Sequence, residues 1–349
     1  MPSSLPSGRW PDVRVVAAPD KFRGTASAAE VAAAIGRAAA GAGWGCDEIP
    51  VADGGDGLLD VLGGPNRTSL VTGPLGDPVE AGWRYDRGTA VIEMARASGL
   101  LLAGGPDGND PIAADTHGTG ELIQIAVETG AARVIVGLGG SATTDGGLGA
   151  LRALHPHQRL RAVELLVACD VRTPFLDAAE VFGPQKGASR AQVRLLTNRL
   201  RRLADVYLED HGVDVTELAG AGAAGGLAGG LAALGAQLLD GFALVAEEVE
   251  LDQAIEGADL VVTGEGFLDE ASFDGKVVGG VAEMALDLGV PVVAVVGDEI
   301  DADAVRDAAR ASGITEVVSL VERYGKERAM ADAVGCIEDA TAAVLAARR

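Results

Sequence analysis

Short runs of hydrophobic residues recur along the chain without a polar residue at every second position. The clearest runs are residues 13–18, 132–138, 163–168, 258–263 and 290–296. Continuous runs of this length are typical of parallel strands that are buried on both faces of a sheet. Most of them lead through a loop into a segment with helical spacing. The pattern therefore predicts an α/β fold built on parallel sheets.

Helices are indicated by capping residues and by apolar positions three and four residues apart. Ser27 and Glu30 form a capping box ahead of an alanine-rich stretch, so we expect a helix to follow Ser27. Apolar residues recur at helical spacing in 189–211, and 329–347 is predicted to be a C-terminal helix. The segment 68–95 departs from this pattern, because its sequence is typical of a hairpin of two strands.

The length of the chain predicts two lobes. At 349 residues it exceeds the roughly 250 to 300 residues at which a single hydrophobic core stops growing. We expect residues 1–63 and 250–349 to form one discontinuous domain with a Rossmann-like or flavodoxin-like parallel sheet. Residues 64–249 would form an inserted α/β domain.

The charge balance excludes several classes of partner. The chain has 28 basic and 51 acidic residues, a formal net charge of -23, which opposes binding to nucleic acid. The sequence has no apolar run long enough to cross a membrane, and its first twelve residues do not resemble a signal peptide. We therefore expect a soluble, cytoplasmic protein that binds neither nucleic acid nor membrane. Cys46, Cys169 and Cys336 are far apart and indicate neither a disulfide framework nor a zinc site.

The lysines are placed unusually. Three of the four lysines, Lys21, Lys186 and Lys276, lie in glycine-containing loops that run into predicted helix starts. A positive charge is unfavourable at the N-terminus of a helix, whereas an anion is favourable there. The placement indicates phosphate-binding loops, with chance placement as the alternative.

The loop 139–147 follows a predicted strand and opens a predicted helix. Its glycines, Gly139 and Gly140 among them, would let the backbone approach a phosphate, and the hydroxyl groups of Ser141, Thr143 and Thr144 could donate to it. Asp145 could hold Mg²⁺. The alternative is a polar turn with a capping aspartate. The sequence has no GxxxxGK[ST] motif, so the loop is not a P-loop.

The segment 263–276 repeats this order of strand, acids, glycine and lysine. Gly264 and Glu265 follow the strand, and Asp269 and Lys276 come before the next helix. We expect Glu265 or Asp269 to contact a metal or a ribose and Lys276 to contact a phosphate. A capped helix start is the alternative.

Further acidic and basic residues lie at predicted strand ends. Asp53 and Asp56 could share a cation or orient a polyol, although aspartate and glycine are also common in turns. The segment 20–24 places Asp20 beside Lys21 and Arg23, which suits a carboxylate or phosphate ligand. Asp170 ends a buried strand and is a candidate base or metal ligand.

Three weaker motifs have simpler explanations. Residues 182–187, which contain Gln185 and Lys186, are either a ligand loop or a rigid turn before a helix. Residues 220–225 match GxGxxG, but no clear strand precedes them, so close packing through glycine explains them better than a dinucleotide site. His155 and His157 are interpreted as loop residues rather than metal ligands.

Taken in order, these motifs resemble one family, the type 1 glycerate kinases. The resemblance covers roughly residues 14–298 and is carried by APDKFRG, VADGGDG, VIEMARASGL, HGTGELI, GLGGSATTDGG, VACDV, FGPQKGA, GAGAAGG, TGEG and GKVVGGVA. It implies Mg²⁺-dependent transfer of the γ-phosphoryl group of ATP to D-glycerate, giving 2-phosphoglycerate. It also implies two α/β lobes with a cleft between them, and we add a homodimer as a possibility.

The resemblance assigns roles to the matching residues. Catalytic roles are expected for Asp170, Lys186 and Asp269, and a metal-binding role for Asp145. The expected substrate-binding residues are Asp20, Lys21, Arg23, Asp53, Asp56 and Gln185. The expected nucleotide-binding residues are Gly139, Gly140, Ser141, Thr143, Gly264, Glu265 and Lys276.

Two departures from the family leave the acceptor open. Phe267 stands in the GEG-containing loop where relatives carry polar or basic residues, and a segment of a few dozen residues before Val163 is absent. The alternatives are therefore a kinase of another small sugar acid, or a binding protein for glycerate or nucleotide that has lost turnover.

Overall fold

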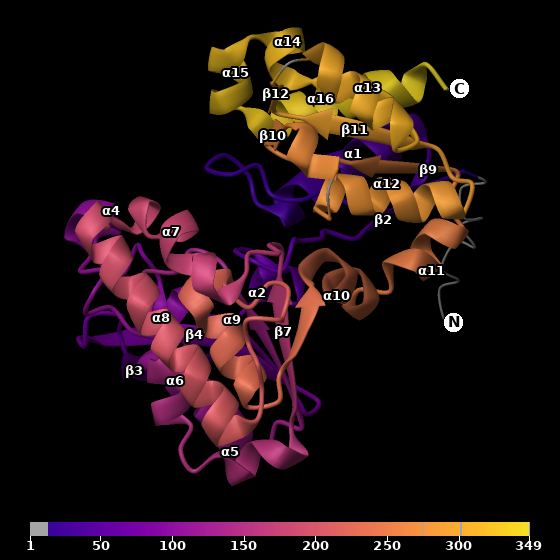
Figure 1. Cartoon of the computed structure of the whole chain (residues 1–349). Coiled ribbons are helices and arrows are strands. Elements are labelled where there is room, and N and C mark those ends of the chain that lie inside the picture. Colours follow the sequence, from indigo (N-terminus) through magenta and orange to yellow (C-terminus); the bar gives the residue numbers. More distant parts are fainter. Residues whose placement is uncertain (1–12, 274, 301, 349) are drawn as a thin grey trace, which may run out of the picture. The chain divides into compact units, whose positions relative to one another are not determined.

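The hydrophobic runs form the centres of two separate sheets, one parallel and one mixed. We describe residues 13–273, 275–300 and 302–348 in a computed structural model of the chain (Figure 1). The chain divides into two compact units. Unit 1 runs up to Ala52 and resumes at Ala246, and unit 2 is Asp53–Val245. The predicted domains, 1–63 with 250–349 and 64–249, stay a proposal.

The sheet of unit 1 has the strand order β13-β11-β9-β1-β2, and all its pairs are parallel. Its strands are β1 (Arg14–Ala17), β2 (Gly45–Glu48), β9 (Leu260–Thr263), β11 (Val292–Val296) and β13 (Ile314–Ser319). A small parallel pair is formed by β10 (Phe267–Leu268) and β12 (Asp298–Glu299). The predicted strands at 13–18, 258–263 and 290–296 are thus confirmed as β1, β9 and β11.

Helices cover the sheet of unit 1. Helix α1 (Ala28–Ala42) begins at the predicted capping box of Ser27 and Glu30 and packs with α16 (Ala333–Ala346) on the alternate side chains of β1, β9 and β11. Helix α12 (Val277–Asp287) contacts β9 and β11. The remaining helices are α11 (Leu251–Glu256), α13 (Ala302–Ala311), α14 (Leu320–Tyr324), α15 (Lys326–Ala331) and the 3₁₀ helix Glu270–Phe273.

The prediction of one C-terminal helix over 329–347 is wrong at its start. Helix α15 ends at Ala331, and α16 begins after Asp332, whose carboxylate accepts a hydrogen bond from the Gly335 amide. Asp332 has a non-helical backbone, with φ -139° and ψ 56°. The aspartate therefore starts a new helix, as aspartates at N-caps commonly do.

The sheet of unit 2 has the order β3-β4-β5-β6-β7-β8. The antiparallel strands β4 (Pro78–Asp86) and β5 (Thr89–Glu93) confirm the predicted hairpin, which turns at Arg87 and Gly88 with positive φ at both. A third strand, β3 (Arg67–Thr72), pairs antiparallel with β4 and was not predicted. From β5 onward the pairs are parallel. The strands that follow are β6 (Arg133–Gly137), β7 (Glu164–Cys169) and β8 (Gln237–Asp240).

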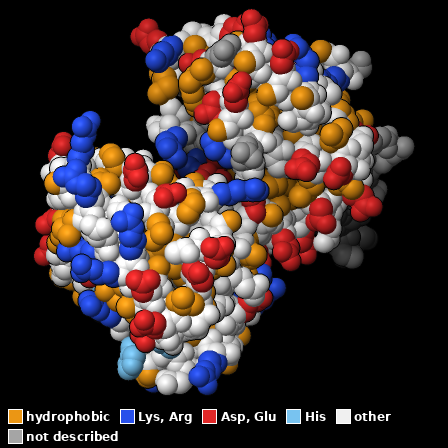
Figure 2. All heavy atoms as spheres, viewed as in Figure 1, with side chains coloured by type: hydrophobic (Ala, Val, Ile, Leu, Met, Phe, Trp, Pro, Cys, Tyr) orange, Lys and Arg blue, Asp and Glu red, His pale blue; other side chains and the backbone are white. Residues whose placement is uncertain are grey.

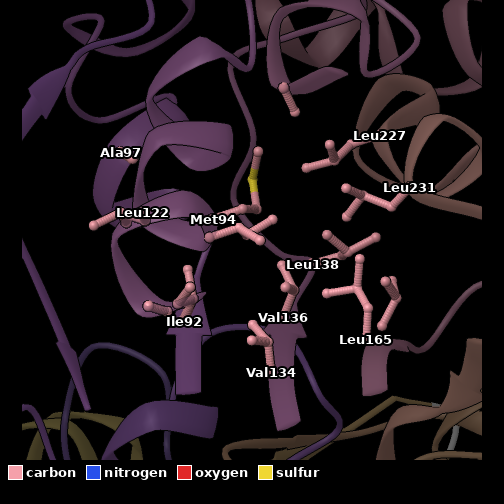
Figure 3. Close-up of a cluster of buried hydrophobic side chains, with 14 of the residues drawn as sticks. Ile92, Met94, Ala97, Leu122, Val134, Val136, Leu138, Leu165, Leu227 and Leu231 are labelled. Carbon is pink, nitrogen blue, oxygen red and sulfur yellow. The ribbon is translucent and has the colours of Figure 1, made fainter. Parts of the chain in front are cut away.

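Side chains from the sheet and from helices on it form the core of unit 2 (Figure 3). Ile92, Val136 and Leu165 from the strands meet Leu122 of α5 (His117–Glu128) and Leu227 of α9 (Ala223–Ala233), all of them buried. The other helices are α2 (Leu58–Val61), α3 (Ala95–Ser98), α4 (Gly105–Gly108), α6 (Leu148–Ala153), α7 (Ala178–Phe182), α8 (Arg190–His211) and α10 (Gly241–Glu248), with 3₁₀ helices at His157–Ala162, Phe175–Asp177 and Pro184–Lys186.

Helix α8 confirms the helix predicted over 189–211. It begins at a capping box of Ser189 and Gln192, and Leu196, Leu200 and Tyr207 are buried on its inner face. Its exposed face carries five arginines, and Figure 2 shows Lys and Arg side chains gathered over this helix. A locally basic surface therefore exists on a strongly acidic protein. Within the described residues no helix is long and apolar enough to span a membrane.

Candidate functional site

The carboxyl ends of parallel strands bring several predicted site residues to one edge of unit 2. Glu93 of β5 is paired with Gly137 of β6, and Cys169 of β7 is paired with Asp240 of β8. The loop 138–147 therefore starts beside Glu93, and Asp170 starts beside Asp240. Open α/β sheets bind their ligands at this edge, so we take it as the candidate site of unit 2.

The loop 138–147 is fixed by backbone pairing to the segment after α3. Leu100 donates from its amide to the carbonyl of Gly140 (2.8 Å), and the Ala142 amide donates to the carbonyl of Ser98 (3.0 Å). Gly140 has a positive φ of 61° and is exposed. The backbone at Gly140 is therefore accessible from solvent, and its contact with a phosphate stays a prediction.

The hydroxyl groups of Thr143 and Thr144 are buried. Ser141, Thr143 and Thr144 are buried. The Oγ1 atoms of Thr143 and Thr144 have no hydrogen-bond partner among the described residues. A contact between Thr143 and a nucleotide stays a prediction, and it would require this hydroxyl to become accessible.

Asp145 is held inside the loop by donors from the protein. Its Oδ2 accepts from the amide and hydroxyl of Thr116 (3.0 and 2.8 Å) and from the Gly149 amide (2.9 Å), while its Oδ1 accepts from the Gly147 amide (3.1 Å). Burial raises the pKa of Asp145, and these hydrogen bonds act in the opposite direction. A carboxylate with this many donors fits an anchor of the loop better than the expected metal ligand.

Lys186 is also buried, with 2% of its surface exposed. Its Nζ donates to the carbonyl oxygen of Thr143 (2.6 Å) and lies over the ring of Phe182. Burial lowers the pKa of Lys186 to about 7, opposed by the negative charge of Asp145. Contact between this amine and a phosphate stays a prediction, since the amine would have to leave Thr143. In the structure Lys186 supports the loop.

The pH dependence of stability tests the burial of Lys186. Unfolded lysine titrates near 10.4, so between pH 7 and about 10 the unfolded chain binds more protons at this site than the folded chain. Burial of the charged amine destabilises the folded state most below pH 7, and this destabilisation decreases as the pH rises. The free energy of unfolding of the wild type, relative to Lys186→Met, is expected to rise by up to roughly 1.4 kcal/mol per pH unit.

Denaturant titrations of both proteins at pH 7, 8 and 9 would measure this difference. The exposed Lys326, replaced in Lys326→Met, is the control and should give a difference that does not change with pH. A flat difference for Lys186→Met as well would show that the amine is not buried in solution.

The glycines of 220–226 bring α9 against the same loop. Ala224, Gly225 and Gly226 have positive φ, and a Cβ atom on Gly225 would lie 2.0 Å from the Thr143 carbonyl oxygen. The Gly146 amide donates to the carbonyl of Gly225 (3.0 Å). The glycines therefore serve close packing, which was the preferred interpretation of this GxGxxG match.

Asn109 was missed by the sequence analysis. Its Nδ2 donates to the carbonyls of Ala142 (3.0 Å) and Lys186 (2.9 Å), so one side chain ties the loop 138–147 to the segment that contains Gln185, which is exposed. No motif marks this asparagine, because its role depends on two carbonyl groups that are distant in the sequence.

The loop from Asp53 to Gly57 lies across the ends of β6 and β7. A Cβ atom on Gly54 would lie 2.9 Å from Cβ of Ala168, and one on Gly139 would lie 2.9 Å from the amide nitrogen of Asp56. Asp53 accepts a hydrogen bond from the Gly55 amide (3.1 Å), and Asp56 is exposed. The predicted residues Asp53 and Asp56 therefore share this edge of the sheet with Asp170.

Acidic groups surround the end of β7. Asp170 and Asp240 are exposed, and Asp240 caps α10 by accepting from the Ala243 amide (2.9 Å). Burial raises the pKa of Cys169 to about 11, and the charges of Asp170 and Asp240 act in the same direction. Cys169 is therefore a buried thiol and not a nucleophile.

Unit 1 has its own candidate site, also at strand ends. The Asp20 amide donates to the carbonyl of Gly264 (2.8 Å), so the loop after β1 lies beside the loop after β9. Asp20 and Lys21 form an ion pair (3.7 Å), and Arg23 is exposed. Only glycine fits at position 264, because a Cβ atom there would lie 1.9 Å from the Val295 carbonyl oxygen.

Glu265 is the most perturbed carboxyl group of this second site. Burial raises the pKa of Glu265 to about 7, the Ser272 hydroxyl and Lys276 lower it, and Asp20 and Asp269 raise it further. Its Oε1 is buried without a hydrogen-bond partner in the described parts of the chain. Asp269 accepts from the amide of Ser272 (2.9 Å), and Lys276 is the N-cap residue of α12.

The described carboxyl groups of each candidate site are too dispersed to form a metal-binding cluster. The described residues contain no group of three or more His, Cys, Asp or Glu side chains arranged to hold one. The ring of His157 instead contacts the ring of His155 edge-on and the ring of His211 at a tilt. The unpartnered Oε1 of Glu265 is nevertheless the hard oxygen ligand that Mg²⁺ prefers.

Comparisons with known proteins agree with the resemblance seen in the motifs. The model of the glycerate kinase family matches residues 15–156 and 155–349. The Escherichia coli protein named glycerate 2-kinase is 39% identical over 336 residues, covering 83% of this chain and 86% of that protein. The Bacillus subtilis protein named glycerate kinase is 40% identical over 325 residues, covering 82% and 85%.

A solved structure is similar over nearly the whole chain. It belongs to a Salmonella typhimurium LT2 protein assigned as glycerate kinase 2, with a TM-score of 0.82, 34% identity and coverage of 96% of this chain and 98% of that one. The family match is split at 155–156, where the sequence analysis expects a segment of the relatives to be absent. The chain belongs to the glycerate kinase family, whose members are phosphotransferases with an alcohol group as acceptor.

Proposed function

We propose that the protein transfers the γ-phosphoryl group of ATP to D-glycerate with the help of Mg²⁺ and forms 2-phosphoglycerate. The observation that carries the proposal is the carboxyl edge of unit 2, which Asp53, Asp56 and Asp170 share with the exposed backbone of Gly140. The names of the relatives from E. coli and B. subtilis support glycerate as the acceptor.

The proposed mechanism divides the work between positioning and charge. Phosphoryl transfer needs little covalent chemistry, so catalysis depends mainly on orientation and on stabilising the charge of the transferred group. In our proposal Asp170, exposed at the end of β7, accepts the proton of the attacking hydroxyl group. Asp53, Asp56 and Gln185 contact the acceptor, and Gly139, Gly140 and Ser141 contact the nucleotide.

A second set of proposed ligand contacts lies in unit 1. Lys21 and Arg23 are cationic groups for the anionic parts of the ligands, with Asp20 holding Lys21 through their ion pair. Gly264 and Lys276 would contact the nucleotide, and Asp269 would act in catalysis. Glu265 and Asp269 are the residues that would hold Mg²⁺, which when bound neutralises negative charge on the phosphate groups.

The buried residues of the loop are assigned supporting roles. Lys186, Asp145 and Thr143 hold the loop in shape, as their hydrogen bonds indicate. Another small sugar acid is the second candidate acceptor. Two features favour it: Phe267 is 46% exposed in its loop, and the connection before β7 is shortened. Cytoplasmic location and a homodimer remain predictions.

Phosphorus NMR tests the function and its regiochemistry together. Purified protein mixed with ATP, Mg²⁺ and D-glycerate should convert ATP to ADP and produce the resonance of 2-phosphoglycerate. The same mixture with other short hydroxy acids tests the second candidate. Absence of any glycerate-dependent ADP would refute the proposal, and a 3-phosphoglycerate product would refute its regiochemistry.

A further inference from the structure

Glu93 is a buried carboxylate at the carboxyl edge of unit 2 for which no role has been given above. It is the last residue of β5, pairs with Gly137 of β6, and is 4% exposed. Glutamate is almost never fully buried unless it is paired, because removing its charge from water is costly. The groups that contact Glu93 must therefore compensate for the cost of burying its charge.

The partners of Glu93 lie on one short segment of the chain. Its Oε1 accepts hydrogen bonds from the amides of Gly57 and Leu59, both 2.9 Å long. Its Oε2 accepts from Nε of Arg96 at 2.9 Å, and Nη2 of Arg96 lies 3.4 Å from Oδ1 of Asp60. The carboxylate and the guanidinium group therefore both bind the segment from Gly57 to Asp60.

This segment depends on Glu93 for its shape. Helix α2 has four residues, and its N-cap, Gly57, has a left-handed backbone and provides no side-chain cap within the described structure. A helix this short is not stable alone, and its first amides need acceptors. Glu93 supplies the acceptor, so it also fixes the end of the loop that carries Asp53 and Asp56.

The hydrogen bonds indicate which ligand this loop accepts. The amides of Gly55, Gly57 and Leu59 are already bonded to the carboxylates of Asp53 and Glu93. They are therefore not available to a phosphate, and the negative charges of the loop would repel one. Carboxylate oxygens remain suitable for the hydroxyl groups of an acceptor, which are donors.

We propose that Glu93 is a positioning residue that holds the Asp53–Gly57 loop in the conformation that receives the hydroxyl groups of the acceptor. This inference rests on the proposed function, because it takes the acceptor to be a small hydroxy acid. Glu93 acts through the amides of Gly57 and Leu59 and does not contact the ligand. Its loss should therefore weaken binding of the acceptor and leave binding of ATP nearly unchanged.

Steady-state kinetics of Glu93→Gln and Glu93→Ala test this selectivity. The glutamine keeps one acceptor oxygen for the two amides but loses the acceptor for Arg96, whereas alanine loses both. The KM for D-glycerate is expected to rise at least tenfold in Glu93→Ala and by less in Glu93→Gln, with the KM for ATP within twofold of wild type. Glu128→Gln, which alters an exposed glutamate paired with Arg159, is the control and should change neither value.

Hydrogen exchange provides a readout that does not need turnover. In Glu93→Ala the amides of Gly57 and Leu59 should exchange at least tenfold faster, while the amides of β6 and β7 keep their wild-type rates. A folded Glu93→Ala protein with unchanged exchange in 55–61, or with equal increases of both KM values, would overturn the inference. If the wild type does not phosphorylate glycerate but the exchange still changes, the proposed function fails and Glu93 still positions the loop.

Discussion

Replacing Asp170 by asparagine is expected to lower kcat for glycerate phosphorylation by roughly 10²- to 10⁴-fold, the usual contribution of a general base. The substitution is nearly isosteric and the side chain is exposed, so folding should be unaffected. The KM values should change little, because asparagine can still donate and accept hydrogen bonds at the same position. A coupled assay of ADP release would measure both constants.

Asp177→Asn is the matched control for this experiment. Asp177 is also exposed, lies seven residues further along the chain, and belongs to the 3₁₀ helix Phe175–Asp177. It should keep the wild-type kcat. If Asp170→Asn retains more than half of the wild-type kcat, the base is another group and the assignment of Asp170 has to be abandoned.

Replacing Gly225 by alanine is expected to lower the free energy of unfolding by about 3 kcal/mol or more. Its φ of 70° is strained for a residue with a Cβ atom, at about 1–2 kcal/mol. The added atom would also lie 2.0 Å from the Thr143 carbonyl and 2.7 Å from Cα of Thr144, an overlap with backbone that forces the loop to move. Denaturant titration measures the loss of stability.

Gly212→Ala separates the two causes. Gly212 ends α8 with nearly the same φ, 71°, but no atom lies within 4 Å of its added Cβ among the described residues. It should cost about 1–2 kcal/mol from backbone strain alone. Equal losses for the two variants would contradict close packing at Gly225. The folded Gly225→Ala protein should also lose activity, because the displaced loop carries Gly139 and Gly140.

Features that depend on neighbours in the sequence were predictable. The capping box of Ser27 and Glu30 signals the start of α1 because both partners lie within one helical turn. The continuous hydrophobic runs indicate β1, β6, β7, β9 and β11, because a strand buried on both faces has no reason to alternate. The break between α15 and α16 at Asp332 was not predicted, because alanines continue at helical spacing on both sides of it and give no local signal of a break.

Features that depend on distant contacts were not predictable. Glu93 and the Gly57 amide are 36 residues apart, and Lys186 and the Thr143 carbonyl are 43 residues apart. Glycine-rich loops with a lysine predict phosphate binding on local grounds, but the lysine amine points to a carbonyl that only the fold provides. For the same reason the roles of Asn109 and Asp145 became visible only in the structure.

The loop 138–147 is held in its conformation independently of any ligand. Asn109, Lys186 and Gly225 already hold its backbone through hydrogen bonds before any ligand arrives, and Thr116 holds the side chain of Asp145. A ligand at Gly139 and Gly140 would therefore restrict little additional motion, and most of its interaction energy would appear as affinity. Preorganisation of this kind makes the loop a rigid docking surface rather than a closing lid.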